Sequence, residues 1–431
     1  MLQKATVTKT VKVRLLEPNR NKESALEATL ETFREACTLF VRALEEVKAD
    51  GSKRKLRRLL NGEIYHKVRD ETKLPTVLVQ NAADVAIEAY LSYKDKKKKH
   101  KKASLPSFKR IRSFRVDKRG FNLIDSANKY RFLISLRLLT GRVIIPLEAL
   151  YEHYPFKMLD EVSRGAWSLG SVTIIKRRKR KKKEWWVHIT ISKEVEVEIP
   201  DDPTPIGVDM GTVNLAVVST PSAVLFFSGR EWWHRRRRWK EIREKLQKER
   251  RFRAIKRIGD KERRYNNDLA HKISRAIVET AKKERNPVIV LEDLTNIRDD
   301  MDFSSEQNYK NHGWFFNRLQ SFIAFKAIEA GIPVFFVRPA WTSATCPKCG
   351  DAHPKNRDRK MHRYKCQYCG YELNDDLVAA INIARLFKHV ASDYMSGVMG
   401  GMTPPRRVRS SRPYPNRTSG CPGEGRRSRL I

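Results

Sequence analysis

The spacing of apolar residues divides the first half of the chain into a strand, two helical segments and a series of short strands. Apolar and polar residues alternate from 5 to 16, which predicts a half-buried strand. Helical spacing follows from 22 to 48 and again from Thr76 to Tyr93, where Pro75 suits a first turn. The period returns to two between Phe108 and Pro200, and the predicted strands are 113–116, 121–124, 130–134, 142–145, 171–175 and 185–191. We therefore predict a β-barrel-like domain that includes the opening strand and carries the helices as an insertion.

The second half of the chain alternates strands with helices, which is typical of an α/β domain. Residues 206–228 hold three predicted strands. A long helical region runs from Trp232 to Glu284, with its break predicted at Gly259 and Asp260. A short apolar strand at 288–291 is followed by a helix predicted from about Gly313 to Ala330 and by a fifth strand at 332–337.

Three carboxylates stand where these strands end or where a later helix begins. Asp209 ends an apolar strand between Gly207 and Gly211, whose missing side chains allow backbone or metal to approach. Glu292 ends the strand at 288–291, and Asp375 or Asp376 supplies the third carboxylate at the start of a helical segment that begins at Asn374. Such a set can hold two Mg²⁺ ions, which stabilise the attacking and leaving oxygens of a phosphodiester displacement.

Two further acids lie beside this set. Asp375 is the alternative to Asp376 at the helix start. Asp293 is expected to cap or orient, because neighbours on a strand point to opposite faces.

The three segments that carry the acids resemble the three motifs of a RuvC-type nuclease. They read GVDMGTVNLAVVS at 207–219, VIVLEDL at 288–294 and NDDLVAAINIA at 374–384. In order and context they are most similar to the TnpB proteins of insertion sequences, which are RNA-guided DNA endonucleases related to the type V CRISPR effectors. The resemblance is strong from about 200 to 388 and weaker over the first 200 residues. It implies an RNase H-like (RuvC) α/β core in which Asp209, Glu292 and Asp376 are catalytic and bind magnesium.

The third motif departs from the family pattern at the helix start. Aligned on Ala379, Ala380 and Asn382, Asp376 takes the catalytic place. Asn374 then stands where an aspartate is usual, and Asp375 stands where an arginine is usual. The resemblance therefore favours Asp376 over Asp375 and leaves the three acids complete.

The resemblance also implies partners and a division into domains. The expected partners are a guide RNA and a double-stranded DNA target beside a short adjacent motif. The implied domains are a β-barrel-like wedge domain at 1–20 and 103–200, a helical recognition insertion at 21–102, a RuvC-like core at 201–342 and 371–390, a zinc ribbon at 343–370 and a disordered basic tail at 391–431.

The charge of the chain also points to a nucleic acid. Eighty-nine lysines and arginines against 50 acids give a net charge of +39, which indicates a polyanionic partner. A membrane surface is disfavoured, because no apolar run approaches the roughly 18 residues of a spanning helix. No secretory signal is expected either, so we place the protein in a prokaryotic cytoplasm, associated with the nucleoid. The basic runs that we expect to contact nucleic acid lie at 96–102, 176–183 and 235–238.

Four of the six cysteines form a metal-binding pattern. Cys346 and Cys349 make one Cys-x2-Cys pair, and Cys366 and Cys369 make a second, sixteen residues later. Four thiolates complete a tetrahedral Zn²⁺ shell, so this zinc is expected to be structural, with His353 and His362 at the surface. Cys37 is expected to be a small buried residue within a helix, and Cys421 lies in the tail without a role.

Gln80 and Asn81, on the helix after Pro75, have two interpretations. They are candidates for reading base edges, but solvated helix positions are favoured.

The overall prediction is a Mg²⁺-dependent, RNA-guided DNA endonuclease of a transposable element. A miniature type V CRISPR effector would share the same motifs. An RNA-guided DNA-binding protein or transposition regulator without cleavage is the alternative from another class, and the presence of all three acids disfavours it. A strand-joining transposase is disfavoured because no tyrosine or serine recombinase motif stands out.

Overall fold

The computed structural model describes residues 2–16, 18–99, 103–127, 129–179, 182–294, 315–338, 341–358 and 361–395. The chain forms two compact units, one of Thr6–Glu194 and the other of Met1–Ala5 with Val195–Ile431. Residues 396–431, with Cys421 and most of the predicted tail, lie outside the described residues. The domain boundaries proposed from the sequence stay a prediction.

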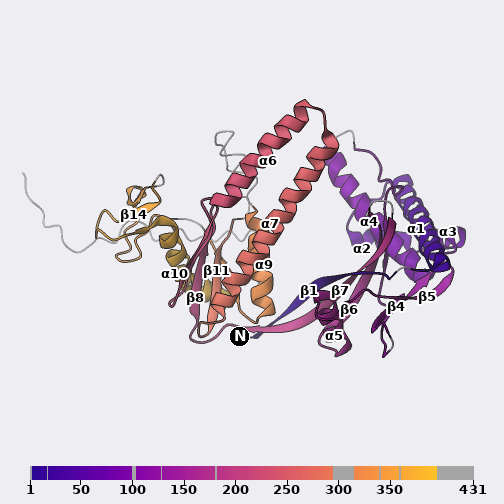
Figure 1. The fold of residues 1–431 in the computed structure, drawn as a ribbon, viewed down its shortest axis with the longest axis horizontal. Helices are drawn as coiled ribbons and strands as arrows, with labels where there is room; N and C mark the ends of the chain where they lie inside the picture. The colour runs from indigo at the N-terminus through magenta and orange to yellow at the C-terminus, as the bar shows by residue number, and fades with distance from the viewer. Residues whose placement is uncertain are drawn as a thin grey trace, which may run out of the picture. The chain divides into compact units, whose positions relative to one another are not determined.

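The unit Thr6–Glu194 contains two antiparallel sheets, with strand orders β1-β7-β6-β2 and β3-β4-β5 (Figure 1). The bounds are β1 (Leu2–Arg14), β2 (Ser113–Val116), β3 (Phe121–Asp125), β4 (Phe132–Leu138), β5 (Gly141–Pro146), β6 (Ser168–Lys179) and β7 (Lys182–Glu198). The place of β1 beside β7 confirms that the opening strand joins the later strands. An isolated bridge pairs Leu15 with Leu147, but the strands described form two sheets, so closure into a barrel stays a prediction.

Five helices complete this unit: α1 (Arg20–Glu46), α2 (Lys53–Leu60), α3 (Glu63–Thr72), α4 (Thr76–Lys99) and α5 (Tyr154–Ser163). The apolar pattern missed α2, α3 and α5, because helices of 8 to 10 residues show too few turns for a period. The predicted end of α4 at Tyr93 was also wrong. Lysine is a good helix former, and Lys97 donates a 2.9 Å hydrogen bond to the Tyr93 hydroxyl one turn earlier.

In the other unit, five strands form a mixed sheet with the order β10-β9-β8-β11-β12 (Figure 1). The bounds are β8 (Thr204–Asp209), β9 (Asn214–Ser219), β10 (Val224–Ser228), β11 (Pro287–Glu292) and β12 (Val334–Val337). The first three strands are antiparallel, whereas β11 runs parallel to both β8 and β12. This arrangement confirms the predicted α/β class and places the ends of β8 and β11 at one edge of the sheet.

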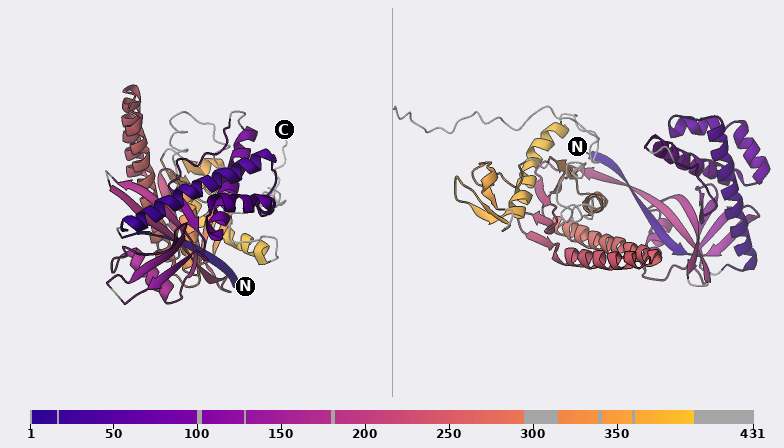
Figure 2. Two further views of the ribbon diagram at one scale, coloured as in Figure 1. Left: turned by 90° about the vertical axis from the view of Figure 1, so that its right-hand side faces the viewer. Right: turned by 90° about the horizontal axis from the view of Figure 1, so that it is seen from above.

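Helices α6 (Arg230–Lys248) and α7 (Phe252–Ala281) pack side by side as a hairpin (Figures 1 and 2). The break predicted at Gly259 was wrong, because Gly259 lies inside α7 and the turn is at 249–251. A glycine in a helix costs only about 1 kcal/mol. The turn itself is formed by Arg250, whose φ of 53° is left-handed, and no glycine or proline marks it.

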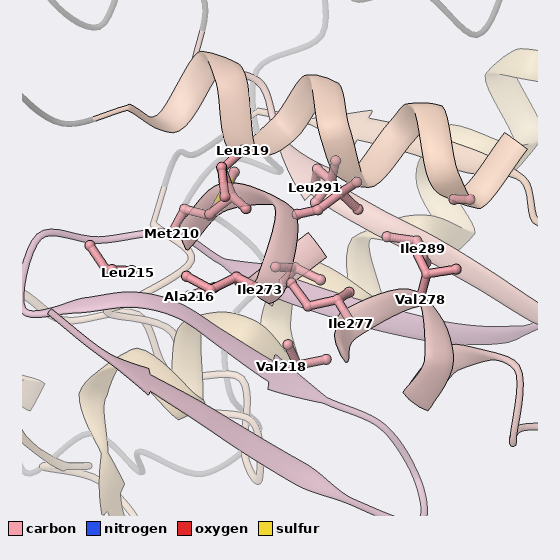
Figure 3. Packing of buried hydrophobic residues seen from close by; sticks show 14 of the residues in the cluster. Met210, Leu215, Ala216, Val218, Ile273, Ile277, Val278, Ile289, Leu291 and Leu319 are labelled. Carbon is pink, nitrogen blue, oxygen red and sulfur yellow. The ribbon is translucent and has the colours of Figure 1, made fainter. Parts of the chain in front are cut away.

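The main core of this unit lies between the sheet and the helices α7 and α9 (Phe316–Glu329). Figure 3 shows Leu215, Ala216 and Val218 of β9, Ile289 and Leu291 of β11, and the facing residues Ile273, Ile277, Val278 and Leu319 of the helices. A smaller cluster on the opposite face joins β11 and β12 to Ile383 and Phe387 of α10 (Asp375–Met395). The sheet is therefore covered on both faces, which explains the nearly continuous apolar sequence of β11.

A small three-stranded sheet precedes α10 and has the order β13-β14-β15. Its strands are β13 (Arg357–Asp358), β14 (Arg363–Lys365) and β15 (Glu372–Asn374), and a 3-10 turn, η1 (Pro354–Asn356), precedes β13. Strand β15 continues directly into α10. Within the described residues, no helix combines the length and the apolar character needed to cross a membrane.

Candidate active site

The alternation of β11 decides which way its acid points. Val288 and Val290 pack in the cluster that contains α10, whereas Ile289 and Leu291 pack against α7 and α9. Successive side chains of a strand point to opposite faces, so Glu292 points to the α10 face and Asp293 to the other. This agrees with the separate role expected for Asp293.

The register of β8 against β11 places two of the predicted acids side by side. Leu291 pairs with Val208 in parallel register, and the next residue along each strand is an acid, Glu292 and Asp209. Gly207 lies two residues before Asp209 and therefore faces the same side of the sheet. Both acids thus lie at the strand ends on the face that α10 covers.

The third acid is brought in by close packing of α10 on Gly207. A Cβ at position 207 would lie 1.9 Å from the carbonyl oxygen of Ala380, so only glycine fits this contact. Asp376 precedes Ala380 by one helical turn, a rise of about 6 Å. Asp209 follows Gly207 by about 6.6 Å of strand, so the helix start comes level with the strand end.

The start of α10 separates its two aspartates. The Asn374 side chain caps the helix by accepting from the backbone N–H groups of Asp376 and Leu377, each at 3.1 Å. The fully buried Asp375 accepts a 2.7 Å hydrogen bond from Arg357 Nε. Asp376 instead accepts a 2.8 Å hydrogen bond from Asn214 of β9, which places it at the strand ends.

Burial raises the pKa values of the three acids, and repulsion by the other two raises that of Asp209 further. Burial, followed by the charges of Glu292 and Asp376, raises the pKa of Asp209 well above its ordinary range, against a weaker lowering effect of Arg357. Burial also raises the pKa of Glu292, which is 6% exposed, and that of Asp376, which is 7% exposed. Three converging carboxylates, of which Glu292 and Asp376 are buried, form the donor set that binds divalent cations. The half-buried Asp209 leaves the group open to solvent.

Three residues that the sequence analysis did not single out, together with Asn382, hold these acids in place. Thr342 Oγ1 donates to Glu292 Oε1 at 2.7 Å, and Gln320 donates to the Glu292 carbonyl at 2.5 Å. The Asn382 side chain donates to the carbonyls of Thr342 and Thr345 at 2.7 and 2.8 Å, which ties this loop to α10. Arg357 Nη2 lies 3.6 Å from Asp376 Oδ1. Asn214 and Asn382 stand inside the quoted motifs, whereas no spacing in the sequence marks Thr342 or Arg357.

The four predicted cysteines form one cluster. Their sulfurs all lie within 4.8 Å of one another, with Sγ···Sγ distances of 3.6 Å for Cys346 and Cys369 and 3.5 Å for Cys349 and Cys366. A tetrahedral Zn²⁺ with Zn–S bonds near 2.3 Å places its sulfurs about 3.8 Å apart, so the cluster fits zinc.

Each Cys-x2-Cys pair ends in a left-handed glycine that closes the turn. Gly350 and Gly370 have φ values of 80° and 70°, and each donates its backbone N–H to the carbonyl of the first cysteine of its pair. These turns direct the backbone N–H groups of the loop toward sulfur. Although burial opposes it, hydrogen bonds from the backbone of Cys349 and Lys348 lower the pKa of Cys346 to about 7, which favours the thiolate form of this cysteine, whereas burial raises the pKa of Cys349 and Cys366.

The two histidines of the ribbon have different positions. His353 accepts a hydrogen bond from the backbone of Lys355 and lies apart from the sulfurs, as expected of a surface residue. His362 differs from that expectation, because it is only partly exposed and its Nδ1 lies 3.5 Å from Asp375 Oδ1. His362, Asp375 and Asp376 therefore form a second cluster of possible metal ligands.

The structure divides the basic run 235–238 into two kinds of residue. Arg236 is buried, donates to Glu262 at 2.5 Å and lies over the ring of Trp232, so it is part of the α6–α7 packing. Arg235, Arg237 and Arg238 are exposed. Trp232 itself is 1% exposed and belongs to the core of this unit.

The two candidates for base reading are both engaged within the protein. Asn81 is buried and donates to the Val77 carbonyl at 2.7 Å, so neither base reading nor a solvated position describes it. Gln80 accepts a 2.6 Å hydrogen bond from Arg119. Cys37 is fully buried in α1, as expected.

Two family models match the chain. Residues 188–298 match the family described as "Probable transposase", and residues 316–383 match the family described as "Cas12f1-like, TNB domain". The first match contains Asp209 and Glu292. The second contains all four clustered cysteines and Asp376.

Individual relatives agree with these family models. The CRISPR-associated endodeoxyribonuclease Cas12f1 of Sulfoacidibacillus thermotolerans is 28% identical over 305 residues, which cover 65% of this chain and 70% of the relative. A TnpB-like protein of Methanocaldococcus jannaschii is 37% identical over 127 residues, or 29% of this chain and 44% of that protein.

Among solved structures, a Cas12f1–sgRNA–target DNA complex matches with a TM-score of 0.63 and 16% identity, covering 88% of this chain and 99% of that one. At this identity the match shows the fold alone, which is a Cas12f-like fold.

Proposed function

Because the chain belongs to the TnpB family of insertion-sequence proteins, which is related to the Cas12f type V effectors, we propose that it is an RNA-guided DNA endonuclease. The observation that carries this proposal is the meeting of Asp209, Glu292 and Asp376 at one end of the mixed sheet. The relatives' names support the activity, since one is called an endodeoxyribonuclease and a solved relative is bound to an sgRNA and target DNA.

In this proposal the three carboxylates bind two Mg²⁺ ions. The ions, when bound, neutralise the charge that develops on the attacking and leaving oxygens of the phosphodiester. Asp209 and Glu292 supply ligands from adjacent strands, and Asp376 supplies the third from α10. Thr342 and Asn214 fix the orientation of Glu292 and Asp376 by their hydrogen bonds, which keeps the ligand oxygens converged before the metal arrives.

Asp376 is the third ligand in preference to Asp375. Asp375 is fully buried and bonded to Arg357 Nε, whereas Asp376 is bonded to Asn214 and acts more strongly on the pKa of Asp209. Asp375 then orients Arg357. The cysteine cluster binds one Zn²⁺ and stabilises the ribbon that carries Arg357 and precedes α10.

The unit Thr6–Glu194 is proposed to hold the guide RNA scaffold and to read a short motif beside the DNA target, as wedge and recognition domains. Base pairing then selects the rest of the target. The net charge of +39 supplies the attraction to both nucleic acids. The proposed location of the protein is a prokaryotic cytoplasm.

A miniature type V CRISPR effector is the second candidate. The Cas12f1 relative, which this chain matches over 70% of its length, favours it. The two candidates share the chemistry and differ in the source of the guide. An RNA copied from the flank of the protein's own gene indicates a transposable element, whereas an RNA from a repeat array indicates a CRISPR effector.

The test is to express the protein with its genomic flank and to sequence the RNA that co-purifies. The complex is then incubated with plasmids that carry a randomised motif beside a matching target, with and without Mg²⁺. Asp209→Ala, Asp375→Asn and Asp376→Asn are compared with the unchanged protein. We expect cleavage that requires RNA and Mg²⁺, is abolished by Asp209→Ala and Asp376→Asn, and is only reduced by Asp375→Asn.

Three outcomes would contradict parts of the proposal. A discrete RNA with target binding but no cleavage would replace the nuclease by a non-cleaving regulator. Cleavage without a discrete RNA would contradict the proposal that an RNA guides the protein. Cleavage lost in Asp375→Asn but kept in Asp376→Asn would exchange the two aspartates.

A further inference from the structure

The outer part of the α6–α7 hairpin lacks a core of its own. Every residue from 237 to 265 is described, and none of their side chains is buried. We call this segment the distal arm. Its apolar residues Ile242, Leu246, Ile255 and Ile258 are half-buried or exposed, whereas the proximal parts of both helices contribute buried residues such as Trp232 and Ala270.

Few contacts tie the two helices of the distal arm together. Glu262 accepts from both Arg236 and Arg243 at 2.5 Å, and the rings of Trp239 and Tyr265 lie 5.5 Å apart edge to face. All of these contacts lie in the half of the arm nearer its base. Helices in proteins take most of their stability from packing of an apolar face, so an arm without one is suited to a partner that covers it.

The charge of the distal arm specifies the chemistry of that partner. Residues 237–265 contain fourteen lysines and arginines against five acids. At the tip, Lys245, Lys248, Arg250, Arg253, Lys256 and Arg257 are all exposed. Among the described residues, the carboxylate partner found at the tip is Glu249, 3.3 Å from Arg251. A predominantly positive surface concentrates positive potential and fits the phosphates of a nucleic acid.

One aromatic side chain stands in the middle of these charges. Phe252 is the first residue of α7 and is 66% exposed, between Arg251 and Arg253. The left-handed Arg250 makes the tight turn that starts α7 at this residue. A lone exposed phenylalanine needs no explanation by itself, but an aromatic ring among backbone-binding cations is the arrangement that binds unpaired nucleotides.

We propose that the tip of the distal arm is a nucleic-acid contact, in which Phe252 stacks on an unpaired base and the surrounding cations hold the flanking phosphates. The inference rests on the proposed function for the class of partner. It concerns a strand whose base is free to stack, and therefore a single-stranded segment and not the interior of a duplex. Because stacking is tolerant of sequence, the contact adds affinity without reading bases.

The first test measures binding of the full-length protein to labelled 20-nucleotide oligothymidine, oligouridine and a 20-base-pair duplex, without Mg²⁺. Phe252→Ala, Phe252→Leu and Phe252→Trp are compared. We expect Phe252→Ala and Phe252→Leu to weaken single-strand binding by at least about 5-fold, Phe252→Trp to retain it, and duplex binding to stay unchanged. A larger loss with thymidine than with uridine assigns the contact to DNA, and the reverse assigns it to RNA.

The second test separates the tip from the general positive charge of the chain. Arg250→Gln/Arg253→Gln is compared with Lys282→Gln/Lys283→Gln, a matched pair of exposed cations at the other end of α7. We expect the tip pair to lower the slope of log K against log salt by about 1.4 for a single strand, and the control pair to leave it unchanged. Cross-linking to 5-iodouracil, located by mass spectrometry, is expected within 248–257.

The proposal is overturned if Phe252→Leu binds as well as the unchanged protein, if the duplex loses as much affinity as the single strand, or if the cross-links all lie outside the arm. These measurements need neither guide nor cleavage. If the protein passes these tests but does not cleave DNA, the nuclease proposal is refuted and the proposed contact at the tip stands. If it cleaves DNA but fails these tests, only the proposed contact is refuted.

Discussion

The acid centre, which consists of Asp209, Glu292 and Asp376, lies in the same unit as the cysteine cluster. The two are assembled in different ways. The cysteines come from two short loops whose glycines close identical turns, and their sulfurs already lie near the spacing that zinc imposes. The acids come from two strands and a helix, with more than 80 residues between one acid and the next, and burial raises the pKa of all three.

This difference explains why one region suits structure and the other suits chemistry. Four thiolates leave a zinc ion no open position. Three carboxylates leave positions for water and substrate, and the partly exposed Asp209 keeps them accessible. The two regions also depend on one another, because Arg357 and Thr342 belong to the cysteine segment or its approach and contact the acids. The following predictions test this comparison.

Cys366→Ser is expected to have the largest effect on folding. Loss of a thiolate ligand removes the zinc, and the free energy of unfolding of the ribbon falls by more than about 5 kcal/mol. Metal content and thermal unfolding measure both effects, with Cys37→Ala in the other unit as a control that keeps its zinc. Full zinc occupancy in Cys366→Ser would show that the cluster is not a four-cysteine site.

Asp209→Asn is expected to lower cleavage about a thousandfold, since metal binding contributes several kcal/mol to the transition state. The protein without bound Mg²⁺ should become more stable. Because the folded pKa of Asp209 is raised, the stability linked to its proton is present below the ordinary pKa of about 3.9 and is lost as pH rises toward the folded pKa. At pH 7 the uncharged asparagine avoids the free-energy cost of holding a charged Asp209 in this site.

Thermal unfolding of the zinc-loaded protein without added Mg²⁺, compared at pH 5 and pH 8, checks the effect on stability. Asp209→Asn should raise the melting temperature more at pH 8 than at pH 5. A lower melting temperature than that of the unchanged protein would mean that the three acids do not repel one another in the folded state.

Gly207→Ala tests whether packing of α10 assembles the acid centre. The added methyl meets the Ala380 carbonyl, so α10 must move, at a cost of about 3 kcal/mol and with loss of cleavage. Gly259→Ala is the matched control, because its methyl meets nothing within 4 Å and should stabilise the protein by about 1 kcal/mol. Equal stability of the two variants would contradict the close contact of α10 with β8.

Thr342→Val is expected to have the smallest effect, and it acts on the acid centre alone. Loss of its hydrogen bond to Glu292 should weaken the affinity for Mg²⁺ by about 10- to 100-fold, while zinc stays bound. The readout is the Mg²⁺ concentration that gives half-maximal cleavage. Thr345→Val, whose hydroxyl bonds to the Trp341 carbonyl, serves as the control and should leave that concentration unchanged.

The sequence by itself determined the features that depend on short spacing. The cysteine cluster follows from two local pairs, and the strands that end in Asp209 and Glu292 follow from apolar runs. The order of the three motifs predicted the family. The α6–α7 turn could not be read from the sequence in the same way, since Arg250 carries no turn signal and the glycine that suggested a break lies in a helix.

Only the tertiary structure decided how these parts act together. Parallel register between β8 and β11 sets Asp209 beside Glu292, and the absent side chain of Gly207 lets α10 approach and bring Asp376. Thr342, Asn214 and Arg357 became part of the site for the same reason, because hydrogen bonds and ion pairs depend on distance in space. Side-chain chemistry is written in the sequence, but convergence of residues far apart along the chain arises only when the apolar faces of the sheet and its helices are buried together.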